Sequence, residues 1–557
     1  MKKMFRVFAL LLAVLVTVTA CGQSQPGVPS SGGNEVQSSE AGETDKTSEK
    51  VQLRFATITR GSVPMDDIYM TQYLEEKFNV DIIWEEYAND AWKNQFSLML
   101  TTDNLPDMIL GANLDKNAVN DYGADGYFLN IMDYIDYMPN LKGWLNDETY
   151  ANWAKYQMTD DGAIYGLQRV FPSRIGVATE MNTWINNEWL ENVNMEVPQT
   201  LDELYEVLKA FKEQDANGNG DPTDEIPLCM QIDVNGARGW RTQPILLSAY
   251  GFVTNKQNLI SYVDETGTVG VAETTEEYKE YLKFMNKLYK EGLMEPNAFI
   301  ITNEERVDKT INDKYGVFSD YSGLVTATGG TVEGNPFEKY SLIGALTSEY
   351  NGELVHPFGN CGYSSGSRTY ISAKTEHPEL ICQIIDFFYA DENQIAAEFG
   401  EEGVTFEYVE DAFGNKVPNY IGDYKGATVK LDEQFNMIRT SAVNRVVEAA
   451  DDATLDAMIS DEAMLYSSQA QFEKELRRMD KLVYPFPDLV YPADDNTRRA
   501  ALESDLTNVI ISYKASFILG ELDVEENWEK FQSDLEAAGM QEYIKIQTNA
   551  YNTFMGK

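Results

Sequence analysis

The chain has 557 residues, of which 43% are hydrophobic, and a formal net charge of −46 from 90 acidic and 44 basic residues. This charge argues against nucleic acid or an anionic membrane surface as a ligand, because phosphate groups would be repelled, whereas an uncharged ligand or a cation is compatible with it. The part of the chain beyond residue 50 is too long for one hydrophobic core and favours two lobes.

The N-terminus resembles a bacterial lipoprotein export signal. The apolar run 7–18 is too short to span a bilayer comfortably, and residues 18–21 read Val-Thr-Ala-Cys, like a lipobox whose cysteine takes the diacylglycerol. The alternative is an ordinary signal peptide with a chance cysteine. Before the apolar run stand three basic residues, Lys2, Lys3 and Arg6. We therefore expect a signal peptide over 1–20 and a lipid on Cys21.

Residues 21–50 are rich in Gly, Ser, Pro, Gln and Glu and contain almost nothing to bury. This composition predicts a disordered tether between the lipid and the folded part. Two acyl chains on one residue suffice for stable anchoring. The protein is thus expected at the extracellular face of the cell membrane.

Strands and helices alternate in the first part of the folded chain. Residues 51–58 alternate like a strand, 66–78 have helical spacing, and 80–84 form a second strand. A further helix over 91–101 and a buried strand over 106–110 follow. This order predicts an α/β fold in which crossover helices connect parallel strands.

An acidic loop over 215–225 follows a helix that Thr200 and Glu203 open with a capping box. Short oxygen-bearing side chains at alternate positions, with a glycine at the sixth, can fold round a hard cation such as calcium. The predicted ligands are five side chains and one backbone carbonyl, that of Asp221: Asp215, Asn217, Asn219, Asp221, Asp224 and Glu225.

The acidic loop departs from a helix-loop-helix calcium sensor, because its twelfth position is Ile226 where such sensors have a bidentate glutamate. The alternative interpretation is a turn rich in Asp and Asn without metal. A calcium ion here would fasten the helix end to a strand predicted over 226–231, which is a structural role.

Three further helix signals follow in the second half of the chain. A helix over 275–290 stops at Gly292, and Pro378 fits the first turn of another, which His377 precedes. From residue 498 onward the chain is almost wholly helical. Cys229 and Cys382 lie in apolar runs, which predicts buried free thiols rather than a disulfide.

Catalytic motifs are mostly missing from the sequence. The two histidines, His356 and His377, are each followed by proline, and no Walker loop, dinucleotide fingerprint or His/Cys metal cluster occurs. A glycosidase needs only two carboxylates, but in so acidic a chain pairs such as Glu85-Glu86 are expected on a solvated face. We therefore expect a protein that is not an enzyme.

Long stretches of the chain resemble the large extracellular solute-binding lipoproteins of carbohydrate ABC transporters, of the alginate-binding and LplA/LipO-like type. The most specific stretch is 184–228, from Trp-Ile-Asn-Asn-Glu-Trp through the capping box and the acidic loop to Ile-Pro-Leu. Five other stretches match in the expected order: 98–107, 161–166, 289–293, 377–404 and 520–551.

The resemblance implies a two-lobed, periplasmic-binding-protein-like α/β fold with a hinge and a helical C-terminal part. The first lobe would comprise 51–175 and about 365–430, and the second 176–364 and about 431–557, with the calcium loop. A monomer of this kind closes over an oligosaccharide in the cleft and delivers it to the permease of an ABC importer. The resemblance to the LplA/LipO-like type also implies a Gram-positive bacterium as the source.

The eight Trp and thirty-two Tyr residues can supply platforms for the apolar faces of sugar rings. Candidates for ligand binding follow strand ends or lie in glycine-rich loops, although ordinary packing or a surface position is an equal alternative for each: Arg60, Trp240, Arg241 and Tyr321. The alternatives for the whole protein are a peptide or other solute receptor on the same fold, and a surface glycoside-active enzyme.

Overall fold

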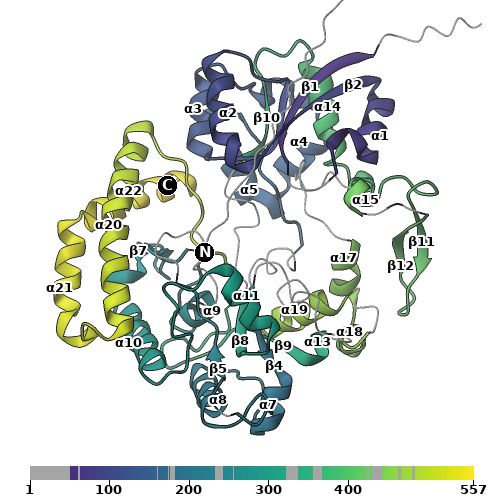
Figure 1. Ribbon diagram of the computed structural model, residues 1–557. Helices are drawn as coiled ribbons and strands as arrows, with labels where there is room; N and C mark the ends of the chain where they lie inside the picture. Colours follow the sequence, from purple (N-terminus) through teal and green to yellow (C-terminus); the bar gives the residue numbers. More distant parts are fainter. Residues whose placement is uncertain are drawn as a thin grey trace, which may run out of the picture. The chain divides into compact units, whose positions relative to one another are not determined.

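The computed structural model describes residues 50–557 apart from 60–62, 160, 174, 176–181, 222, 233–242, 255, 321–335, 356–366, 423, 425, 430–441, 462–465 and 480–482. Two four-stranded sheets and two smaller hairpins alternate with helices (Figure 1). Within the described residues, no helix is both long and apolar enough to cross a membrane.

The first sheet has the strand order β10-β3-β1-β2. β1 (Val51–Ile58) pairs in parallel with β2 (Val80–Tyr87) and with β3 (Met108–Leu114). β10 (Ser367–Ile371) is far from β3 in the sequence and pairs with it in the antiparallel direction. The predicted parallel unit is therefore confirmed, with α1 (Tyr69–Phe78) and α2 (Asn89–Thr101) as its crossover helices.

The predicted helix over 66–78 starts later than expected, because Ile68 is extended and separates α1 from a 3₁₀ turn at Met65–Asp67. The strand predicted over 80–84 continues to Tyr87. Arg54 donates two hydrogen bonds to Glu85, at 2.9 and 2.7 Å, and the Met65 N–H donates to Glu86 at 3.0 Å. This acidic pair thus makes local structural contacts.

The second sheet is mixed, with the order β5-β8-β4-β9. β5 (Ile226–Leu228) lies parallel to β8 (Tyr315–Asp320), whereas β4 (Asn182–Asn186) is antiparallel to both β8 and β9 (Tyr340–Ile343). The strand predicted over 226–231 is therefore real but ends at Leu228. The two hairpins pair β6 (Ser261–Val263) with β7 (Val269–Val271) and β11 (Phe406–Glu410) with β12 (Lys416–Tyr420).

Helices surround the sheets and make up the C-terminal part. The helices between β3 and β9 are α3 (Lys116–Ala124), α4 (Pro139–Asn146), α5 (Ala151–Gln157), α7 (Asn187–Val193), α8 (Leu201–Glu213), α9 (Gln243–Ser248), α10 (Glu276–Lys290), α11 (Asn303–Ile311) and α13 (Pro336–Lys339). Those after β10 are α14 (Pro378–Phe387), α15 (Asp391–Phe399), α16 (Gly426–Val429), α17 (Ala442–Ala449), α18 (Asp452–Ile459), α19 (Ser467–Arg478), α20 (Ala493–Leu519), α21 (Val524–Ala537) and α22 (Met540–Phe554).

Sequence signals for helix ends agree with the structure. The Thr200 hydroxyl and the Glu203 carboxylate form a capping box at the start of α8, and Thr275 caps α10. His377 is the residue before the first turn of α14, with Pro378 inside that turn, as the sequence predicts. The thiols of Cys229 and Cys382 are buried and neither is in a disulfide bond within the described residues, which confirms the prediction for both.

The C-terminal part is confirmed as helical, with α20, α21 and α22 packed side by side (Figure 1). Gly539 makes the turn between α21 and α22 at φ +99°. A Cβ atom at this position would come within 2.5 Å of the Leu502 side chain, so both the backbone and the packing require glycine here.

Each four-stranded sheet packs against a large hydrophobic core of its own and also against a smaller hydrophobic cluster. The first core contains Leu53, Trp153 and Ile385 around the β1 sheet. The second contains Trp189 and Phe211 below β4, together with much of α20, α21 and α22.

The chain alternates between the two cores. It leaves the first core after Val170, enters the second by Ile185 and is back in the first at Ile371. Val490 and Phe554 then pack against the first core again. These repeated crossings resemble a hinged pair of lobes, while the boundaries of the lobes stay a prediction.

Lys116, the first residue of α3, is only 1% exposed, and its ammonium donates to the Gln157 carbonyl at 2.6 Å. Burial lowers the pKa of Lys116 from 10.5 to about 7. Between these two values the unfolded chain binds a proton that the folded chain does not. Lys116 therefore makes the protein less stable as pH falls from 10.5 towards 7.

We expect Lys116→Met to raise the free energy of unfolding near pH 7 by about 1 kcal/mol, with a smaller gain at pH 9. Urea unfolding at both pH values measures this effect. Lys93→Met, at an exposed position of α2, is the matched control and should change little. A gain at pH 9 as large as that at pH 7 would contradict the explanation from burial of the charge.

Candidate functional site

The acidic loop over 215–225 lies between the end of α8 and the start of β5. Gly218 and Gly220 have φ values of +69° and +88°, which turn the backbone tightly. The Asp215 carboxylate accepts from the Gly220 N–H at 2.9 Å, and the Asn219 side-chain oxygen accepts from the Asp221 N–H at 2.8 Å. The loop is therefore closed on itself by its own acidic and amide side chains.

Three carboxylate oxygens of this loop are buried and unsatisfied. Both oxygens of Glu225, which is 2% exposed, and Oδ1 of Asp215 have no hydrogen-bond partner among the described residues. Burial raises the pKa of Glu225, and the charges of Asp224 and Asp215 raise it further. The backbone N–H groups of Glu225 and Asn217 oppose this rise without reaching hydrogen-bonding geometry.

Buried carboxylate oxygens without partners are costly for a folded protein, and a cation held between those of Asp215 and Glu225 would remove the cost. The chemistry of Asp215 and Glu225 therefore fits a hard cation with oxygen ligands.

The Asp224 carboxylate is engaged differently. It accepts from the Asn217 amide at 2.9 Å and from the Asn219 amide at 3.0 Å, and it forms an ion pair with Lys314. The hydrogen bond from Lys314 lowers the pKa of Asp224. The structure thus brings all these predicted ligands into one loop but places a lysine ammonium at Asp224.

Asp221 uses its side chain to bind the Thr223 N–H and hydroxyl, at 3.2 and 2.6 Å, which leaves its backbone carbonyl as the predicted ligand. Within the described part of the chain, no three His, Cys, Asp or Glu side chains are grouped to hold a metal ion. The fit to calcium therefore rests on Asp215 and Glu225, with the other ligands from amide and backbone oxygens.

The residues predicted to bind the ligand lie outside the described residues, as does the predicted lipidation site: Arg60, Trp240, Arg241, Tyr321 and Cys21. Their roles stay predictions. His356 is likewise outside the described part of the chain.

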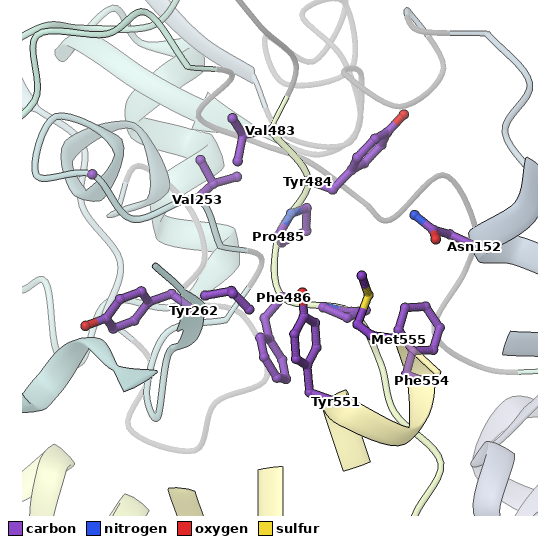
Figure 2. Close-up of a pocket in the computed structure, with 13 residues that line it drawn as sticks. Asn152, Val253, Tyr262, Val483, Tyr484, Pro485, Phe486, Tyr551, Phe554 and Met555 are labelled. Carbon is purple, nitrogen blue, oxygen red and sulfur yellow. The ribbon is translucent and has the colours of Figure 1, made fainter. Parts of the chain in front are cut away.

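A cavity of about 380 Å³ lies where the end of α22 meets the segment 483–487, β6 and α5 (Figure 2). The rings of Phe486 and Tyr551 stack in its wall, with their centroids 5.7 Å apart and their planes at 30°. Tyr484 is 47% exposed and also lines the cavity. Asn152 reaches it from α5.

The sequence contained a signal for this cavity that our sequence interpretation missed. Residues 484–487 read Tyr-Pro-Phe-Pro, so aromatic rings alternate with prolines. Proline has no N–H to pair in a sheet and fixes φ, and such a segment presents its aromatic side chains on a stiff, extended backbone. Its partners on α5, β6 and α22 are far away in sequence.

Comparison with known proteins finds a family and relatives that this chain resembles. Residues 69–399 match the family of bacterial extracellular solute-binding proteins. FusA of Streptococcus pneumoniae serotype 4, a fructooligosaccharide ABC transporter substrate-binding protein, is 26% identical over 98% of this chain and 97% of its own length. Lipoprotein LipO of Bacillus subtilis is 24% identical over 63% of this chain and 66% of its own.

Solved structures agree with the fold. FusA of S. pneumoniae in complex with kestose has a TM-score of 0.66 at 22% identity, covering 91% of this chain and 99% of that one. An EF-hand mutant of FusA in complex with fructo-nystose gives the same values. The alginate-binding protein AlgQ2, solved without calcium ion, has a TM-score of 0.63 at 19% identity, covering 92% of this chain and 100% of that one.

These matches confirm the predicted two-lobed α/β fold with a helical C-terminal part, and they confirm the resemblance stated from the sequence. Of these relatives, FusA is a substrate-binding protein of an ABC transporter. With more than half of its length matching the family, the chain belongs to the bacterial extracellular solute-binding proteins.

Proposed function

We propose that this protein captures an oligosaccharide outside the cell and delivers it to the permease of an ABC importer. The observation that carries the proposal is the full-length relation to FusA, whose name assigns it to fructooligosaccharide transport. An uncharged glycan is also compatible with a chain of net charge −46. In this proposal the protein acts as a monomer, with lobes at 51–175 plus 365–430 and 176–364 plus 431–557.

A thermal-shift screen with kestose, nystose, maltotriose and trigalacturonate tests the receptor role. A receptor is stabilised by saturating ligand according to its affinity, and it releases no new reducing ends from the sugar. A glycoside-active enzyme would instead release product steadily. Stabilisation by an oligopeptide pool alone would favour the alternative of a peptide receptor.

The acidic loop is proposed to hold one structural calcium ion. Support comes from the unsatisfied oxygens of Asp215 and Glu225. Two solved relatives support this proposal, since one is an EF-hand mutant of FusA and the other is an alginate-binding protein solved without calcium ion. The ion would be held by Asp215, Glu225, the side-chain amides of Asn217 and Asn219 and the backbone carbonyl of Asp221. The Asp224 carboxylate would then interact with both the ion and the Lys314 ammonium. Calcium there would tie α8 to β5.

Cys21 is proposed as the site of lipid attachment. We expect wild-type cells to incorporate labelled palmitate into the protein, and Cys21→Ala to lose the label and release the protein from the envelope, or leave it unprocessed. The folded part should keep its melting temperature in both cases. Cys382→Ser, at a buried thiol of α14, controls for label elsewhere and should keep the palmitate. A wild-type protein without any palmitate would overturn this assignment.

A further inference from the structure

We propose that the cavity beside the end of α22 is a subsite for the uncharged rings of the transported oligosaccharide, which rests on the receptor function proposed above. Its volume of about 380 Å³ lies at the small end of the range for small-molecule sites. This space suits one or two sugar rings of a longer chain.

The aromatic wall supplies platforms for the apolar faces of sugar rings. Tyr484, which lines the cavity, presents a ring that is 47% exposed, and the stacked pair of Phe486 and Tyr551 supplies further aromatic faces. Exposed rings in a concave site bind the C–H face of a sugar, while the sugar hydroxyls remain available for polar partners. Pro485 and Pro487 fix the backbone on which Tyr484 and Phe486 stand.

Two polar groups face this space without partners of their own. Within the described residues, neither the Asn152 amide nor the Tyr551 hydroxyl makes a hydrogen bond to the protein, and both line the cavity. Figure 2 shows Asn152 approaching from the side opposite Tyr262, with Tyr551 between them. An amide offers both donors and an acceptor, which matches neighbouring hydroxyls on one ring.

The lining also identifies the class of sugar. The described residues that surround the cavity include no Lys, Arg, His, Asp or Glu. A uronate carboxylate would have no cation to pair with there, and the negative charge of the whole chain would repel it. The subsite therefore fits neutral rings such as hexoses or fructose rather than galacturonate.

The cavity is lined by residues that are associated with both of the large hydrophobic cores. Asn152 precedes Trp153 of the first core, and Phe554 packs against that core as well. Tyr262 packs against the second core. A sugar ring in this subsite would contact groups that belong to each core, so binding here favours one arrangement of the two.

Isothermal titration of kestose, nystose and trigalacturonate into calcium-loaded protein tests the subsite. We expect Tyr484→Ala to weaken binding of the neutral sugars roughly tenfold to a hundredfold, by analogy with the loss of a stacked base. Tyr484→Phe keeps the ring and should retain most of the affinity. Asn152→Ala should weaken binding several-fold, since it removes one polar partner.

The matched control is Tyr408→Ala, because Tyr408 on the β11 hairpin is 43% exposed, close to the exposure of Tyr484. It should leave the affinity unchanged, and the melting temperatures of all variants should stay near that of the wild type. A scaffold role for Tyr484 would instead lower the melting temperature.

The outcomes separate the subsite from the receptor function. Tight binding of kestose that both Tyr484→Ala and Asn152→Ala leave unchanged would overturn the subsite and leave the receptor function standing. Binding of trigalacturonate alone, weakened by Tyr484→Ala, would overturn the assignment to neutral rings. A wild-type protein that binds no sugar of the panel would overturn both proposals together.

Discussion

Calcium should stabilise the wild-type protein, and Glu225→Gln should reduce this response. The amide keeps the shape of the side chain but removes the charge that a calcium ion needs, so affinity for the ion should fall at least tenfold. At a calcium concentration of about 100 Kd the wild type gains roughly 2.7 kcal/mol over the metal-free protein. A rise of several degrees in the melting temperature follows. Calorimetry with EDTA and then excess calcium measures both.

The same substitution should have the opposite effect without calcium. Because both oxygens of Glu225 are buried and unsatisfied, the wild type carries an unpaired charge in the metal-free state. Glu225→Gln removes that charge, so in EDTA the variant should be at least as stable as the wild type.

Glu213→Gln, at the exposed end of α8, is the control and should keep the full calcium response. A Glu225→Gln protein that responds to calcium like the wild type would show that the ion does not bind at Glu225. An anomalous map or a titration with no ion in the loop would refute the site altogether.

An oligosaccharide that fits should draw the two lobes together. A ligand shifts a conformational equilibrium only through better contacts in one state, and closure round a cleft supplies such contacts. Small-angle scattering should show a smaller radius of gyration with the sugar. Tryptophan fluorescence should change over the same concentration range. A protein that binds kestose with no change in the radius of gyration would contradict closure.

Trp240→Ala should weaken that binding by roughly tenfold to a hundredfold, if the indole is a stacking platform as the sequence predicts. Trp240→Phe is the matched control, because it keeps an aromatic face. An unchanged dissociation constant for Trp240→Ala would remove this residue from the site and leave the receptor proposal intact. Steady release of product from the sugar would overturn the receptor proposal itself.

Local sequence patterns predicted the elements whose stability is local. The strand over 51–58, the capping box at Thr200 and the glycine after α10 depend on neighbouring residues, and the structure contains each of them. The antiparallel addition of β10 to β3 and the mixed second sheet were missed. Both depend on pairing between strands far apart in the chain, which no local pattern reports.

In the candidate site, too, the sequence predicted the features formed by neighbouring residues and missed the contacts between distant ones. The spacing of oxygen-bearing side chains identified the acidic loop, because its ligands are close in sequence. The ion pair between Asp224 and Lys314 spans 90 residues, and the burial of Glu225 depends on how α8 and β5 pack. The cavity at Tyr484 joins groups from α5, β6 and α22, so its existence required the tertiary structure.

The prolines that flank Phe486 have a consequence for the kinetics of uptake. A wall whose backbone is held by Pro485 and Pro487 needs little ordering when a sugar arrives, so the entropic cost of capture is small. Sugars of similar size should then associate at similar rates, and discrimination among them should appear in how long each stays bound. The receptor must also release the sugar to the permease. The residence time of the bound sugar would therefore set the balance between selectivity and transport rate.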